Sequence, residues 1–151
     1  MMYRERYLRI ASGGDIKATT DGVIKFIELC KKYGDGAIIV PTKNYVEDSM
    51  LCNAINRDAI IKLKENSPVQ LPNGVVNGLC DDGNIIPARV YLVLWATKYM
   101  IEAAEAKESK AIVVVTWLPE DANKWIELYG PCGPCGPNGP NGPNGPNICV
   151  F

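Results

Sequence analysis

The chain has 151 residues, which suits one domain, and its 47% hydrophobic and 22% charged residues are ordinary for a globular protein. Its net charge of −1 gives no overall basic field, so nucleic acid is not an expected partner. The sequence contains no histidine, which excludes Ser-His and Cys-His nucleophile pairs and the usual general base near neutral pH.

The N-terminal residues MMYRERYLRI contain no apolar run of the kind that forms a signal peptide. The longest strongly apolar stretch, 90–96, is too short to cross a bilayer. We therefore expect a cytoplasmic protein with no membrane partner. The arginines at 4, 6 and 9 alternate with other residues, including Glu5, and we interpret them as a solvated strand edge rather than a phosphate contact.

The first third of the chain predicts a strand, a helix and a second strand. Residues 6–12 alternate loosely and run into a Gly-Gly pair, which indicates a strand and then a loop. A helix follows, capped by Thr20 or Asp21 and stopped by Gly34. Residues 36–40 form a short, β-branched apolar run, which is typical of a strand buried on both faces.

The middle of the chain predicts two helical regions separated by extended residues. The first helical stretch begins near Val46 and breaks near Asn56. Residues 69–80 are extended around a Pro-Asn-Gly turn at 72–74, which predicts either a β-hairpin, placed at an edge of the sheet, or an irregular excursion. A long helix is expected over 87–109, opened by a proline and apolar almost all round in its first half.

The last elements of the domain are a strand over 111–116, apolar throughout, and a helix that opens at Pro119 and is anchored by Trp125. Strands that alternate with helices predict an α/β three-layer sandwich with a mostly parallel, Rossmann-like sheet. We assign this domain to residues 1–129.

Residues 130–147 are six Gly-Pro-x triplets, followed by a short apolar end at 148–151. The repeat resembles collagen, in which only glycine fits the axis of the triple helix, and its prolines favour polyproline II while opposing both helix and ladder. The resemblance implies that the tail promotes oligomerisation. The expected partner is therefore a further copy of the chain, and a collagen-like helix would give a trimer. The apolar end is expected to pack between chains or onto a domain.

Three cysteines lie in this tail: Cys132, Cys135 and Cys149. Residues 132–135 have the four letters of the thioredoxin redox motif, and the resemblance goes no further. In polyproline II the first two cysteines lie about 9 Å apart along the axis, beyond the ~7 Å limit for Cα atoms in a disulfide. We therefore expect interchain or tail-to-domain disulfides, with thiol redox chemistry or a shared metal site as less favoured alternatives.

Ligands of parallel sheets bind beyond the carboxyl ends of the strands, and this rule nominates three loops. The candidate ligand-binding residues are Gly13, Gly14, Asp15, Lys17, Thr42, Lys43, Thr116 and Trp117. The first loop could seat a phosphate at a helix N-terminus. However, it matches neither GxxxxGK[ST] nor GxGxxG. No catalytic residue, metal site or cofactor is therefore assigned.

Three functions remain open. The favoured one is a structural or assembly protein whose α/β domain oligomerises with help from the collagen-like tail. The second is a small Rossmann-like enzyme or nucleotide- or ligand-binding protein of unknown substrate. The third is a thiol redox or metal protein that uses the cysteines of the tail.

Overall fold

The computed structural model describes residues 4–12, 15–42, 50–65, 67–71, 74–81, 83–135 and 145–151. In chain order its elements are β1 (Glu5–Arg9), α1 (Ile16–Tyr33), β2 (Asp35–Ile39), the 3₁₀ helix η2 (Met50–Asn53), α2 (Arg57–Lys64), β3 (Val69–Leu71), β4 (Gly74–Cys80), β5 (Val90–Ala96), α3 (Lys98–Glu105), β6 (Ala111–Thr116), the 3₁₀ helix η3 (Pro119–Ala122), α4 (Asn123–Tyr129), β7 (Cys132–Pro134) and β8 (Ile148–Val150).

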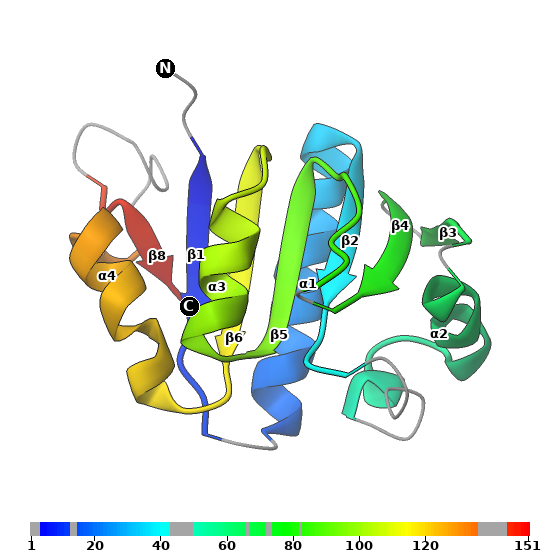
Figure 1. Cartoon of the computed structure of the whole chain (residues 1–151), viewed down its shortest axis with the longest axis horizontal. Helices are drawn as coiled ribbons and strands as arrows, with labels where there is room; N and C mark the ends of the chain where they lie inside the picture. The colour runs from blue at the N-terminus through cyan, green and yellow to red at the C-terminus, as the bar shows by residue number, and fades with distance from the viewer. Residues whose placement is uncertain are drawn as a thin grey trace.

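The described strands form one sheet in the order β3-β4-β2-β5-β6-β1-β8-β7 (Figure 1). Every neighbouring pair is parallel except β3 with β4, which is antiparallel. The expected mostly parallel α/β sheet flanked by helices is therefore confirmed. The expected hairpin is also confirmed as the β3–β4 edge, although residues 72 and 73 of its turn lie outside the described part of the chain.

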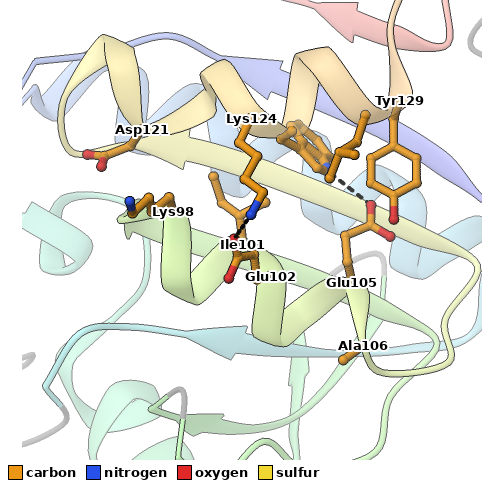
Figure 2. A pocket seen from close by; sticks show the side chains of 10 residues that line it. Lys98, Ile101, Glu102, Glu105, Ala106, Asp121, Lys124 and Tyr129 are labelled. Carbon is orange, nitrogen blue, oxygen red and sulfur yellow. Dashed lines mark hydrogen bonds and ion pairs between the residues drawn. The ribbon is translucent and has the colours of Figure 1, made fainter.

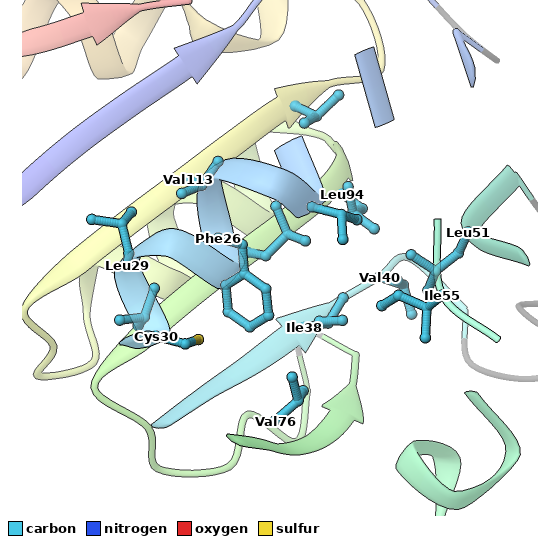
Figure 3. Packing of buried hydrophobic residues seen from close by; sticks show 14 of the residues in the cluster. Phe26, Leu29, Cys30, Ile38, Val40, Leu51, Ile55, Val76, Leu94 and Val113 are labelled. Carbon is cyan, nitrogen blue, oxygen red and sulfur yellow. The ribbon is translucent and has the colours of Figure 1, made fainter. Parts of the chain in front are cut away.

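Alternating side chains of the central strands supply two hydrophobic layers, one on each face of the sheet. Ile38 and Leu92 pack with α1, η2 and α2 on the first face, and Figure 3 shows Phe26 of α1 at the centre of this layer. Ile39 and Val93 pack with α3 and α4 on the second face. Both faces are covered, which explains why β2, β5 and β6 are apolar almost without interruption.

The predicted long helix over 87–109 is wrong. Residues 90–96 form strand β5 at the centre of the sheet, and only 98–105 form helix α3. Thr97 separates the two, because its side chain accepts a hydrogen bond from Met100 N and so caps the helix (3.4 Å). The pairing of β5 with β6 shifts register next to Trp95, whose φ of 55° lies in the left-handed region.

The start of α1 also differs from the prediction. Asp15 is the N-cap, since its side chain accepts a hydrogen bond from Ala18 N, whereas Thr20 and Asp21 lie inside the helix. The predicted stop is confirmed: Gly34 has a φ of 123°, and its N–H donates to Cys30 O. The predicted break near Asn56 is the N-cap of α2.

Both described ends of the tail belong to the sheet. Strand β8 lies between β1 and β7, and its Ile148 and Cys149 are fully buried, so the apolar end packs onto the domain of its own chain. The prediction that prolines would keep the whole repeat out of a ladder is wrong for β7. Because β7 is the outermost strand, Pro134 can lie in it without removing a hydrogen bond that a second neighbour would need. Residues 136–144 of the repeat lie outside the described residues.

Candidate functional site

The loops nominated by the sequence lie at the carboxyl end of the sheet, at the bottom of Figure 1. Strands β1 and β6 are hydrogen-bonded neighbours, but β1 leads into α1 on one face and β6 leads into α4 on the other. This divergence creates a topological switch point between them, the usual position of a ligand crevice in such sheets. The polar side chains at this point decide whether the crevice can receive a polar ligand.

Thr116 closes the gap between the two strand ends. Its hydroxyl oxygen accepts a hydrogen bond from Ala11 N (2.9 Å) and donates one to Ala11 O (2.8 Å). The side chain is 1% exposed. Thr116 therefore satisfies the backbone of the loop after β1 and does not face a ligand.

Asp15 and Lys17 are also occupied within the protein. The Asp15 carboxylate takes the position at the start of α1 that a bound phosphate would need, because it accepts a hydrogen bond from Ala18 N (2.9 Å). Lys17 forms an ion pair with Asp21 (3.0 Å), which also pairs with Arg9 (3.1 Å). In the described part of the loop, the charged groups of Asp15 and Lys17 are therefore used within the protein and are not left for a ligand.

The second nominated loop follows β2, two strands away from β6, with β5 between them. Thr42 is exposed at its start. Lys43, like Gly13 and Gly14 of the first loop, lies outside the residues that the structure describes. The described residues of the three loops therefore do not converge on one polar centre.

Among the nominated residues that the structure describes, Trp117 is the one that presents a large apolar side chain to solvent, with 44% of its surface exposed. Four other exposed apolar residues also follow strands that end at this side of the sheet, and together we call the five the apolar rim: Ile10, Ile16, Tyr99, Trp117 and Leu118. These residues follow β1, β5 and β6, and the ends of β5 and β6 are joined because Trp117 N donates to Ala96 O (3.1 Å). Sequence reasoning missed four of the five, although each is an apolar residue placed in or next to a loop.

The tail cysteines are joined within one chain. Cys135 and Cys149 form a disulfide with their Cα atoms 4.7 Å apart, while Cys132 is free. Cys132 and Cys135 therefore do not form a redox pair here, and burial raises the pKa of the Cys132 thiol, which reduces its thiolate fraction. Within the described residues, no group of three or more Cys, Asp or Glu side chains is placed to hold a metal ion.

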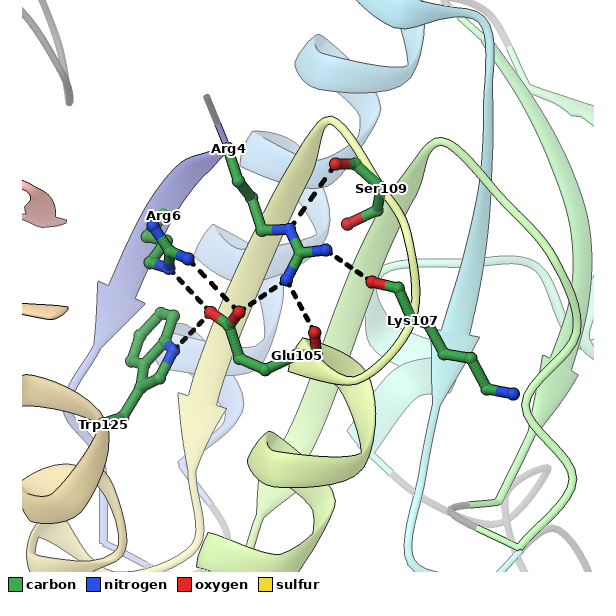
Figure 4. A network of polar contacts seen from close by, with 6 residues as sticks. All are labelled: Arg4, Arg6, Glu105, Lys107, Ser109 and Trp125. Carbon is green, nitrogen blue, oxygen red and sulfur yellow. Dashed lines mark hydrogen bonds and ion pairs between the residues drawn. The ribbon is translucent and has the colours of Figure 1, made fainter. Parts of the chain in front are cut away.

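Arg4 and Arg6 do not lie on a solvated strand edge as predicted. Both converge on the Glu105 carboxylate at the end of α3, which also accepts a hydrogen bond from Trp125 Nε1 (2.8 Å; Figure 4). Arg4 further donates to the carbonyl oxygens of Glu105 and Lys107, which satisfies the free carbonyls at the end of the helix. Burial alone would raise the pKa of Glu105, but hydrogen bonds from Arg6 and Trp125 and the charges of both arginines lower it overall.

This network ties together segments about a hundred residues apart in the sequence. Glu105 is only 9% exposed, and its two oxygens are fully used by the arginines and the indole. A carboxylate engaged in this way is not free to act as a general base. The cluster therefore holds α3 and α4 on the sheet.

Comparison with known proteins adds little to this description. No family model matches the chain, and no curated protein matches it. Among solved structures, the chain is similar to a mutant ATPase domain of the large terminase of Thermus phage P74-26, with a TM-score of 0.45 and 13% sequence identity over 100% of this chain and 76% of that one. A likeness at this level carries no argument about function.

Within the described part of the chain, no helix is both long and apolar enough to cross a membrane.

Proposed function

We propose that this chain is an assembly protein whose α/β domain binds further copies of itself through the carboxyl end of the sheet. The observation that carries the proposal is the apolar rim. Of the large hydrophobic residues exposed in the described part of the chain, most lie in this rim, and the remaining ones, Ile24, Ile61 and Leu128, are distributed over three helices. Apolar residues gathered on a surface mark interaction sites.

The chemistry of this end of the sheet favours a protein partner over a polar ligand. Thr116, Asp15 and Lys17 use their polar groups on neighbouring residues, while the exposed groups are an indole, a phenol and aliphatic chains. Tryptophan and tyrosine contribute strongly to the centres of protein interfaces, because they bury a large area at a small cost in side-chain entropy. The rim therefore suits a contact between folded domains.

The collagen-like repeat supports a second copy as the partner. Strands β7, β8 and β1 are parallel, so the chain leaves β7 at Cys135 on the carboxyl side of the sheet, where the rim lies, and re-enters β8 at Ile148 on the amino side. Association through the rim would bring several repeats together and raise their effective concentration, which favours a polyproline II or triple-helical arrangement of 136–144. In this proposal the oligomer is a trimer, since three chains form a collagen helix.

Light scattering on the whole chain, with and without reductant, tests the proposal. The wild type should have a multiple of the 16.5 kDa chain mass. The double variant Trp117→Ser, Leu118→Ser should be a monomer, whereas Ile24→Ser, an equally exposed residue on α1, should keep the wild-type mass. A monomeric wild type, or an oligomer that survives the double change, contradicts the proposal.

A second variant separates the role of the repeat from that of the rim. Replacing 136–144 by a Gly-Ser linker of equal length should weaken the oligomer without unfolding the domain. Measurements in both redox states matter because disulfides are rare in the cytoplasm, where the sequence predicts this protein to be.

A further inference from the structure

A groove runs between α3 and α4 on the outer side of the second layer, with a volume of about 270 Å³ (Figure 2). Helix α3 contributes residues at positions 98, 101, 102 and 105, which share one helical face, and α4 contributes 124, 125, 128 and 129. The groove extends about 10 Å along α3, at 1.5 Å per residue. At its Lys98 end the groove borders the apolar rim, because Lys98 lies beside Tyr99 and Asp121 accepts a hydrogen bond from Leu118 N.

The floor and walls of the groove are mainly apolar. Ile101 and Trp125 form the floor and are 2% and 3% exposed, respectively. Leu128 stands on the wall and is 61% exposed. A narrow ligand lying in the groove would cover Leu128 and gain about 0.8 kcal/mol for each methylene that leaves water.

The end of the groove near the close of α3 offers no free charge. Glu105 lines it, but its carboxylate is engaged by Arg4, Arg6 and Trp125. Tyr129 covers the same end, with the Arg6 guanidinium stacked 4.0 Å from its ring centroid. The Tyr129 ring therefore forms the wall that a ligand meets at this end. Behind it, Arg4 and Arg6 pair with the Glu105 carboxylate.

The other end of the groove carries an available cation. Lys98 lines the groove and forms no ion pair within the described part of the chain, although its ammonium group lies 5.0 Å from the Tyr99 ring centroid. In contrast, Lys124 pairs with Glu102 across the groove (3.3 Å), and Asp121 accepts a hydrogen bond from Leu118 N (3.1 Å). The lining residues carry two cations and three carboxylates, but Glu105 is neutralised by Arg4 and Arg6, and Glu102 by Lys124.

We infer that this groove binds an unbranched aliphatic monocarboxylate of medium length, with its chain over Ile101, Trp125 and Leu128 and its carboxylate beside Lys98. The apolar floor and the exposed Leu128 favour an aliphatic chain. The wall at the Tyr129 end limits the length of that chain. The unpaired Lys98 favours a negatively charged head group. The shared chemistry is that of a short fatty acid, and no bond is made or broken.

Titration with sodium butanoate, hexanoate and octanoate, followed by NMR of the whole chain, tests this inference. The Trp125 indole N–H and the Ala106 amide should shift in a saturable way. Each added methylene should tighten binding about fourfold until the groove is filled. Octanol, which has the chain without the charge, serves as the neutral comparison.

Two exposed positions can be changed without disturbing the core. Lys98→Met should weaken octanoate binding about threefold to fivefold, as expected for one exposed ion pair, and should leave octanol binding unchanged. Leu128→Ala should weaken both ligands about fourfold. The matched controls are Lys31→Met and Ile24→Ala, which lie on α1 across the sheet and should have no effect.

Three results would overturn the inference: no saturable shift with octanoate, binding that ignores both groove variants, or binding that the α1 variants weaken equally. If instead the groove variants change the mass of the protein in light scattering, the groove is a contact between chains and the carboxylate proposal fails. The proposal for the apolar rim has its own test in the Trp117→Ser, Leu118→Ser variant, since neither residue lines the groove.

Discussion

The Cys135–Cys149 disulfide should supply a large share of the stability of the C-terminal strands, and Cys135→Ser is the cleanest way to remove it. Cys135 is exposed, so a serine there costs little by itself, whereas a serine at the fully buried Cys149 would add the cost of burying a hydroxyl. The variant therefore isolates the effect of the cross-link.

The size of the effect follows from the loop that the disulfide closes. The two cysteines are 14 residues apart in the sequence. Loop closure on that scale lowers the entropy of the unfolded chain enough to stabilise the fold by about 3 kcal/mol. For a domain of this size, that corresponds to a fall in Tm of roughly 6–12 °C when the cross-link is lost.

Urea unfolding measures this difference directly, and hydrogen exchange shows where it acts. We expect Cys135→Ser and reductant to lower the midpoint equally, with the largest gain in exchange at β7, which has only three residues and one neighbour. Cys132→Ser, which removes a free thiol, is the control and should change little. A loss below about 1 kcal/mol, or an equal loss in the control, would refute the loop-entropy reasoning.

Three further substitutions test the contacts that hold the domain together. Glu105→Gln should cost about 3–5 kcal/mol in chemical denaturation, because it leaves two partly buried arginines without their carboxylate. Because the pKa of Glu105 is lowered in the fold, Glu105 stabilises the protein above its unfolded-state pKa, and this stabilisation is lost as pH falls through the folded-state pKa. The free energy of unfolding of the variant should therefore fall less steeply toward acid pH than that of the wild type. Thr116→Val should cost about 2–3 kcal/mol by leaving two backbone groups of Ala11 unpaired, and a cost near zero would show that water replaces the hydroxyl. Gly36→Ala should lower thermal stability by about 1–3 kcal/mol, because its Cβ would lie 2.5 Å from the Phe26 ring; an unchanged Tm would mean that the ring can move.

Local sequence patterns identified most helices and strands. The main wrong prediction, a helix over 87–109, shows what such patterns cannot decide. Residues 90–96 are apolar at almost every position, and a short run of that kind fits a buried helix or a buried strand equally well by periodicity. The proline at 87 favoured a helix, but the β-branched and aromatic residues favoured a strand. The decisive signal was Thr97, a good N-cap that divides the segment where the helix begins.

The polar sites could not be predicted because their partners are distant in sequence. Arg4 and Arg6 meet Glu105 only because β1 lies beside β6, and no local rule pairs residues about a hundred positions apart. The same strand pairing lets Thr116 satisfy Ala11 and so removes it from the candidate ligand site. Residue type nominated the loops correctly as the carboxyl end of the sheet, but only tertiary contacts showed which side chains remain accessible.

The C-terminal end has a structural role that limits how the tail can be tested. Strand β8 pairs with β1, and Phe151 extends this pairing because its N–H donates to Leu8 O (3.0 Å) and its carbonyl accepts from Arg9 (2.9 Å). A truncation after Tyr129 would expose the backbone of β1 and the apolar side chains that now pack against Ile148. The result is an unpaired strand edge that favours aggregation. Such a truncated chain would aggregate for reasons unrelated to the repeat, so a change in its mass would say nothing about assembly. Only replacement of 136–144 with the flanking strands kept can separate the repeat from the sheet that holds its ends.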